Sequence, residues 1–155
     1  MTTHSYSSDW SLQDAKAMSL AHTMGEKKPA AELLEDMRQK LVTIMKPPGT
    51  GRVVVFSMQQ AAVDFVGTFN GDDTVPLALF DKAGKGLCGI DNALSKPMFR
   101  DEDTTDQAGM SSCGDDFGVA VSSWFASEDI DDFLFNGKYG LPPRSQFKIL
   151  ELELE

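Results

Sequence analysis

The stretch that decides the fold runs from Arg52 to Asp91 and reads RVVVFSMQQAAVDFVGTFNGDDTVPLALFDKAGKGLCGID. Short apolar runs alternate here with Asn-Gly and Gly-rich segments, which is typical of strands separated by turns. The run 52–57 has apolar residues on both faces, so it predicts a central strand that is covered on both sides. Residues 75–90 predict two short strands joined as a hairpin around 83–86.

The segment 58–69 within this stretch fits two structures. A helix capped by Ser57 would make 52–81 a β-α-β crossover with parallel strands. An extended conformation would make it part of a meander. We favour the meander, because Gly67-Thr68-Phe69 is poor helix material.

Two helices are predicted before this stretch. Residues 1–10 suggest a loose arm, and a first helix follows from Ser11, with Asp14 at the third position of a capping box, to about Gly25. The second helix begins near Pro29 and ends before Pro47. Its apolar residues recur at helical spacing, and its other side is charged.

The last third is more irregular. Residues 92–116 predict a long loop, 117–125 a strand, and Ser127 the cap of a short helix. From Leu150 onward leucine and glutamate alternate, which predicts a final strand with one solvent-exposed face. Such a strand favours an antiparallel sheet.

These elements predict a single domain, 1–155, of the α+β class. Two N-terminal helices would pack on a mainly antiparallel sheet, with a short helix before the last strand. The alternative is an α/β sheet with one crossover. At 155 residues and 41% hydrophobic composition, the chain is long enough to bury a core.

The net charge of −10 is concentrated in the last third, since residues 101–155 hold 13 acidic and 3 basic side chains. The chain has no basic footprint for nucleic acid or for an anionic membrane, so neither is expected as a partner. It has no apolar run of the ~20 residues that cross a bilayer and no secretory signal, so we expect a cytoplasmic protein. Its two cysteines, Cys88 and Cys113, should be reduced there.

Catalytic and metal-binding signatures are weak. His4 and His22 are the only histidines, and acidic neighbours would raise the pKa of the Cys113 thiol. The segment 47–52 lacks the first glycine, lysine and hydroxyl of a phosphate-binding loop. The acidic run from Asp101 departs from a calcium loop at its sixth and twelfth positions. We therefore expect no cofactor and no metal, and we favour a protein that is not an enzyme.

The acidity suggests a non-catalytic binding module of the inhibitor, immunity or nucleic-acid-mimic type. Its acidic C-terminal surface would engage a basic surface on a protein partner, because clustered like charge steers association. The candidate carriers are Asp101, Glu102, Asp103, Asp106, Asp115, Asp116, Glu128, Asp129, Asp131 and Asp132.

A second hypothesis is a small enzyme or ligand-binding domain with a pocket under the loop 92–116. Its candidate pocket residues are Ser112, Cys113 and Asp116. The oligomeric state does not follow from the sequence.

Overall fold

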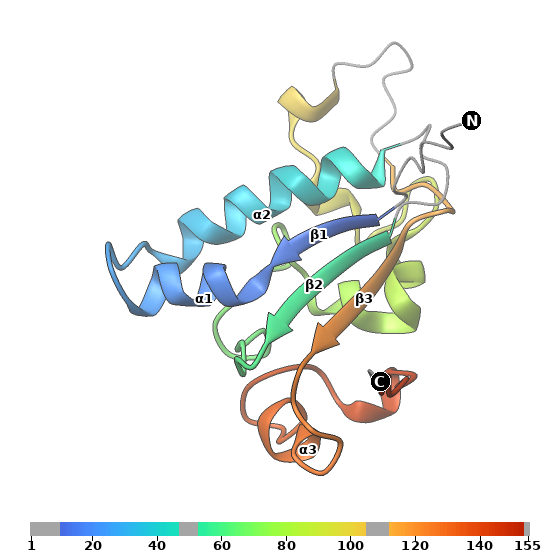
Figure 1. Cartoon of the computed structure of the whole chain (residues 1–155). Helices are drawn as coiled ribbons and strands as arrows, with labels where there is room; N and C mark the ends of the chain where they lie inside the picture. Colours follow the sequence, from blue (N-terminus) through green and yellow to red (C-terminus); the bar gives the residue numbers. More distant parts are fainter. Residues whose placement is uncertain (1–9, 47–52, 105–111, 154–155) are drawn as a thin grey trace, which may run out of the picture.

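Three strands form one all-parallel sheet in the order β1-β2-β3 (Figure 1). The computed structural model describes residues 10–46, 53–104 and 112–153. Within these ranges β1 spans Trp10–Asp14, β2 spans Val53–Gln59 and β3 spans Gly118–Ser123. The prediction of a mainly antiparallel α+β sheet is therefore wrong, and the α/β alternative names the right class.

Helices α1 (Ala15–Thr23) and α2 (Ala30–Met45) carry the chain from the end of β1 back to the start of β2. Such a crossover is what parallel pairing requires. The second helix is confirmed, with Pro29 at its N-cap. The first begins later than predicted, because Trp10–Asp14 pair with β2 and Asp14 then caps α1 by accepting the Ala17 N–H at 2.9 Å. Of the expected arm, residues 1–9 lie outside the described residues.

The described part of the return from β2 to β3 contains turns and three 3₁₀ segments, η1 (Leu77–Leu87), η2 (Lys96–Met98) and η3 (Asp101–Thr104). The hairpin predicted at 75–90 is wrong. The sequence 58–69 forms neither a helix nor a second strand, because β2 ends at Gln59 and turns follow. The crossover considered for 52–81 is absent for the same reason.

Because Gly84 has no side chain, η1 can pack closely against β3, where we had predicted a hairpin. It has a φ of +87°, and a Cβ built there would lie 2.8 Å from Val119 Cγ2. A side chain at this position would force the two segments apart. Gly84 therefore permits close packing of the kinked 3₁₀ segment on the sheet.

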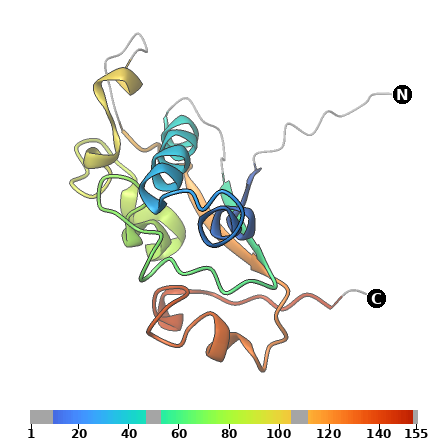
Figure 2. The same ribbon diagram turned by 90° about the vertical axis from the view of Figure 1, so that its left-hand side faces the viewer.

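One face of the sheet is covered by α2 and η1 (Figure 2). The buried side chains of Val54, Phe56 and Met58 alternate along β2 and point into this layer. The ring of Phe56 lies 5.4 Å from that of Phe65 and 5.8 Å from that of Phe80, measured between centroids. This aromatic cluster is the centre of the core.

The strand predicted at 117–125 is confirmed as β3. The segment after it forms α3 (Ile130–Phe133) and η4 (Arg144–Gln146) near the carboxyl ends of the strands (Figure 1). Phe147 anchors it, with its ring 6.1 Å from that of Phe80. The final strand predicted from Leu150 is wrong, because residues 147–153 join no sheet.

None of the described helices combines the length and the apolar character needed to span a bilayer.

Candidate functional site

The second face of the sheet carries exposed apolar side chains. No described helix lies in front of the three strands in Figure 1. Trp10 and Leu12 of β1 are 62% and 69% exposed, and Trp124, just after β3, is 66% exposed. Val53 and Val55 of β2 pair with Trp10 and Leu12 and are half-buried. We predicted that β2 is covered on both sides, as is usual for a parallel sheet, but among the described residues no helix covers this second face.

The edge of β1 is exposed as well. This strand pairs with β2 on one side and, within the described ranges, with no strand on the other. Helix α2 runs beside this edge in Figure 1, in the direction opposite to β1. An edge strand of this kind presents unpaired N–H and C=O groups to an incoming chain.

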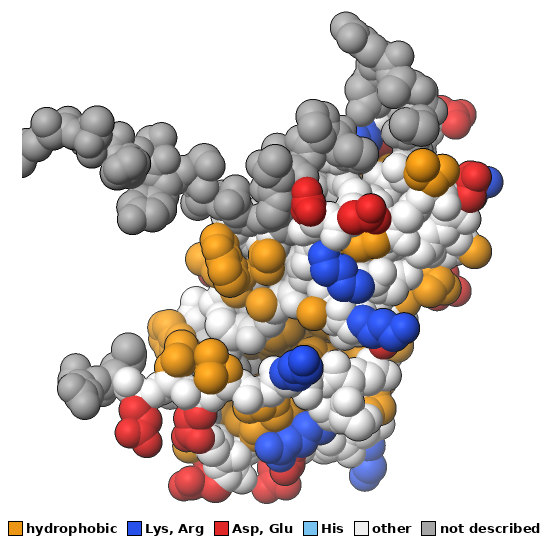
Figure 3. Space-filling model, turned by 90° about the vertical axis from the view of Figure 1, so that its right-hand side faces the viewer, with side chains coloured by type: hydrophobic (Ala, Val, Ile, Leu, Met, Phe, Trp, Pro, Cys, Tyr) orange, Lys and Arg blue, Asp and Glu red, His pale blue; other side chains and the backbone are white. Residues whose placement is uncertain are grey.

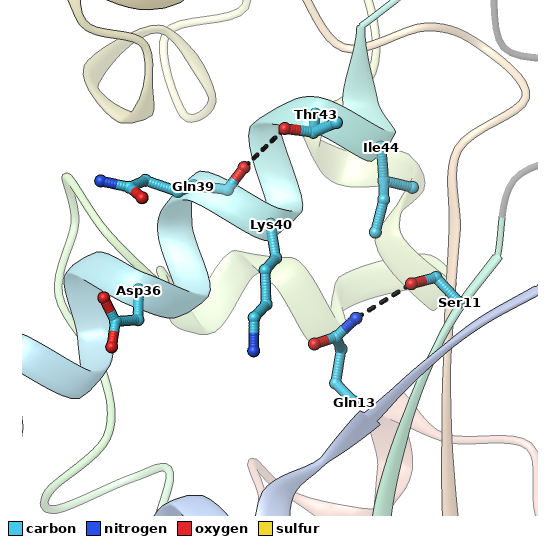
Figure 4. A pocket seen from close by; sticks show the side chains of 7 residues that line it. All are labelled: Ser11, Gln13, Asp36, Gln39, Lys40, Thr43 and Ile44. Carbon is cyan, nitrogen blue, oxygen red and sulfur yellow. Dashed lines mark hydrogen bonds between the residues drawn. The ribbon is translucent and has the colours of Figure 1, made fainter.

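A groove of about 500 Å³ lies between β1 and α2 (Figure 4). Lys40 reaches from the helix into the space, and Gln13 points from the strand towards the helix. Gln13 is buried and donates a hydrogen bond from Nε2 to Ser11 Oγ at 2.9 Å. The full lining is Ser11 and Gln13 from β1 with Asp36, Gln39, Lys40, Thr43 and Ile44 from α2.

The two sides of β1 therefore differ in chemistry. Ser11 and Gln13 face the groove and α2, whereas Trp10 and Leu12 alternate with them and belong to the exposed sheet face. Any strand added beside β1 would continue both surfaces, because successive side chains of a strand point to opposite faces. Its groove-facing positions would meet amides, hydroxyls, Asp36 and Lys40, and its other positions would meet apolar groups.

The acidic residues singled out from the sequence do not form one continuous surface. Asp101, Glu102 and Asp103 lie on η3 and Glu128 to Asp132 lie at α3, at opposite ends of the molecule in Figure 1. On the face shown in Figure 3, acidic side chains gather at two ends with lysine and arginine between them. Asp115 and Asp116 are exposed just before β3, and Asp106 lies outside the described residues.

Asp131 and Asp103 are engaged with arginines of the same chain. Asp131 Oδ2 lies 2.6 Å from Arg144 Nη1 at the surface. Asp103 accepts a hydrogen bond of 2.6 Å from Nη1 of Arg38, which is completely buried. Arg38 also donates from Nη1 to the Met98 carbonyl at 2.8 Å and from Nε to Glu35 Oε1 at 2.8 Å.

This arginine ties α2 to the segment 98–103. Its hydrogen bond holds the pKa of Glu35 below its usual value, against the opposing effect of burial. Burial alone would raise the pKa of Asp103, but the Arg100 N–H and the Arg38 guanidinium outweigh it and lower that pKa. Nε and Nη1 of Arg38 donate to acceptors on the same chain, and Nη2 forms no hydrogen bond but lies 2.7 Å from Glu35 Oε1. This cluster therefore has a structural role.

Cys88 and Cys113 lie next to one another in the fold, which could not be decided from the sequence. Cys113 is buried with its Sγ 3.8 Å from the Sγ of half-buried Cys88, and an antiparallel bridge joins Gly89 to Cys113. Burial, followed by the neighbouring Cys88, raises the pKa of the Cys113 thiol. A thiol of this kind is a poor nucleophile.

The pocket hypothesis gains no support from its residues. Ser112 and Cys113 are buried while Asp116 is exposed, and the groove described above lies elsewhere. In the described part of the chain, no three His, Cys, Asp or Glu side chains are grouped to hold a metal ion. The segment 47–52, considered above as a phosphate-binding loop, falls outside the described residues.

Sequence reasoning missed the β1 edge. The alternation of Trp10 and Leu12 with Ser11 and Gln13 was the available signal, and we assigned it to a helix start. No family model, no curated protein and no solved structure matches this chain.

Proposed function

We propose that this protein is a non-catalytic binding module that takes up an extended segment of a protein partner as an additional strand along β1. The observation that carries the proposal is the exposed edge of β1 with a groove of about 500 Å³ beside it. Main-chain hydrogen bonds to the edge would supply affinity, and alternate side chains would supply specificity. The partner would also cover the apolar side chains of Trp10 and Leu12.

The groove defines the partner's pattern. The polar face of α2 forms the wall behind the added strand, so every second residue of the partner should be polar. The residues between them would lie beside Trp10 and Leu12 and should be apolar. An acidic residue suits the position opposite Lys40.

The test is a selection of random eight-residue peptides, displayed on phage, against the full chain. We expect enriched peptides to alternate polar and apolar residues, and synthetic copies to shift the amide NMR signals of β1 and α2. Lys40→Glu should weaken binding of acidic peptides about tenfold, which is the effect of reversing one such charge pair.

Lys138→Glu is the matched control, because it makes the same charge change at an exposed lysine near α3. Binding should be unaffected by it. If peptides bind without shifting β1 signals, or if both variants bind alike, β1 is not the site.

A second proposal concerns only the acidic residues at α3, which are part of the acidic surface expected from the sequence. Glu128, Asp129 and Asp132 are exposed, and no ion pair engages them among the described residues. We propose that this segment steers a basic protein partner towards the molecule.

Immobilised polylysine is the probe for this second proposal. Changing Glu128, Asp129, Asp131 and Asp132 to their amides should lower the on-rate and flatten its salt dependence. Asp115→Asn with Asp116→Asn tests whether any loss of charge has the same effect. An on-rate unchanged by the four amides would remove this surface from consideration.

A further inference from the structure

Residues 148–153 belong to no helix or strand. Phe147 donates its N–H to Arg144, and no backbone hydrogen bond joins 148–153 to the rest of the described chain. Leu150 is 80% exposed and Leu152 is 77% exposed. A segment with two exposed leucines and no backbone hydrogen bonds can pair as a strand with the edge of another sheet.

The pattern of this segment matches the two surfaces beside β1. In an extended chain Leu150 and Leu152 point to one side, and Ile149, Glu151 and Glu153 point to the other. Placed along β1 with the glutamates towards α2, the segment sets its leucines beside Trp10 and Leu12 on the exposed sheet face. The opposite placement would put leucines against the polar face of α2.

The match of side-chain types indicates the direction, and the spacings of helix and strand are compatible with it. Ile44 and Lys40 lie one helical turn apart in the groove, about 6 Å. Ile149 and Glu151 are two strand residues apart, about 6.6 Å. Because α2 runs opposite to β1, a segment parallel to β1 sets Ile149 against Ile44 and Glu151 against Lys40. Glu153 then lies towards Asp36, the acidic end of the groove.

The segment is not placed to reach β1 of its own chain. Residues 147–153 lie by the carboxyl end of β3 in Figure 1, whereas β1 is the opposite edge of the sheet. A second copy of the chain carries the same segment and presents the same edge. A reciprocal exchange between two copies uses both and closes with two-fold symmetry.

We propose that two copies of this chain associate by exchanging residues 148–153, each segment adding as a parallel strand to β1 of the other copy. The proposal rests on the binding site put forward above and names its occupant. Each copy has a formal net charge of −10, so the copies repel one another. Salt screens this repulsion, and the dimer should therefore strengthen as ionic strength rises.

Sedimentation velocity of the full chain over a range of concentrations and salt is the test. We expect a monomer–dimer equilibrium that shifts towards dimer with added salt. Leu150→Ser with Leu152→Ser should weaken the dimer about a hundredfold, because two leucines lose their apolar contacts. The segment is exposed and unpaired, so this variant should keep the stability of the monomer.

Charge exchange tests the register. Lys40→Glu should weaken the dimer about a hundredfold, because it reverses two symmetric charge pairs at about tenfold each, and adding Glu151→Lys in the same chain should restore it. Asp36→Asn should strengthen the dimer, because it removes the like charge opposite Glu153. Lys138→Glu makes the same change in net charge as Lys40→Glu, so it should weaken association only through the added repulsion and by much less than Lys40→Glu does.

A chain that stays monomeric at all concentrations, or a dimer that the leucine variant leaves intact, overturns the exchange. The peptide selection separates this result from failure of the binding site itself. If the protein is monomeric but selected peptides still shift β1 signals, only the occupant is wrong. If no peptide binds either, the β1 site is wrong as well.

Discussion

The two faces of the sheet are built from the same three strands and differ in what covers them. On the covered face Phe56 is completely buried and contacts the rings of Phe65 and Phe80. On the exposed face Leu12 and Trp10 are mostly accessible to solvent. Burial of apolar surface stabilises the folded state, so we expect the covered face to supply most of the stability, and we propose the exposed face as the recognition surface.

The sharpest test of this contrast is a pair of truncations. Phe56→Ala should destabilise the protein by about 4 kcal/mol, because it leaves a cavity in the aromatic cluster. Urea unfolding followed by circular dichroism measures the loss. Equal destabilisation by Leu12→Ala would show that the second face also stabilises the fold.

Substitution of Arg38 tests how much the contact between α2 and the segment 98–103 contributes to stability. Arg38→Ala should cost about 3 kcal/mol, because it leaves the Met98 carbonyl and the Asp103 carboxylate without their buried donor. Arg38→Lys keeps the charge but cannot reach three acceptors in the same way, so we expect a smaller loss. Chemical unfolding of both variants gives the comparison, and a loss below about 1 kcal/mol in Arg38→Ala would contradict it.

A disulfide formed between Cys88 and Cys113 should raise the stability of the protein. Oxidised glutathione can take two electrons from the Cys88 and Cys113 thiols, which form one disulfide while two molecules of glutathione are released. The crosslink should add about 3 kcal/mol and raise Tm by about 8 °C. Mass spectrometry and calorimetry check this, with Cys88→Ser as the variant that should not respond.

The same thiols should differ in reactivity. Because the pKa of Cys113 is raised and its side chain is buried, iodoacetamide at mildly alkaline pH should label Cys88 first. Peptide mapping of partially labelled protein shows the order. Faster labelling of Cys113 would mean that its surroundings are more open than the structure shows.

Acid should weaken the arginine cluster. The pKa values of Glu35 and Asp103 are lower in the folded than in the unfolded protein, whose values are near 4.5 and 3.8. The stability that these two carboxylates contribute is fully present at pH values above their unfolded-state pKa values. It is lost as the pH falls through their lower folded-state pKa values. Stability measured between neutral and acid pH should fall less steeply in Arg38→Ala than in the parent protein.

The smallest expected effect lies on the exposed face. Leu12→Ser should change the free energy of unfolding by less than about 0.5 kcal/mol, because its side chain is already in water. It should nevertheless weaken peptide binding and self-association, which need this surface. A variant that loses stability but keeps both kinds of binding would reverse our assignment of the two faces.

The sequence pattern correctly identified those elements in which burial of one face produces a regular repeat of apolar residues. The α2 stripe and the apolar run that became β2 were recognisable because burial on one face leaves a repeat in the sequence. Trp10–Asp14 escaped recognition because five residues carry too short a repeat to separate a strand from a helix start. The hairpin predicted for residues 75–90 was wrong for another reason, since Gly84, which suggested a turn, permits close packing on β3.

The sequence by itself determined the second helix, the central strand and the concentration of acidic residues in the last third. The tertiary structure alone decided that the strands run parallel, that β1 is an edge beside a groove and that the two cysteines meet. Partners such as Arg38 and Met98 lie 60 residues apart in the chain. A repeat of two or four residues reports only which face of an element is buried, whereas the choice of partner depends on how distant segments pack together.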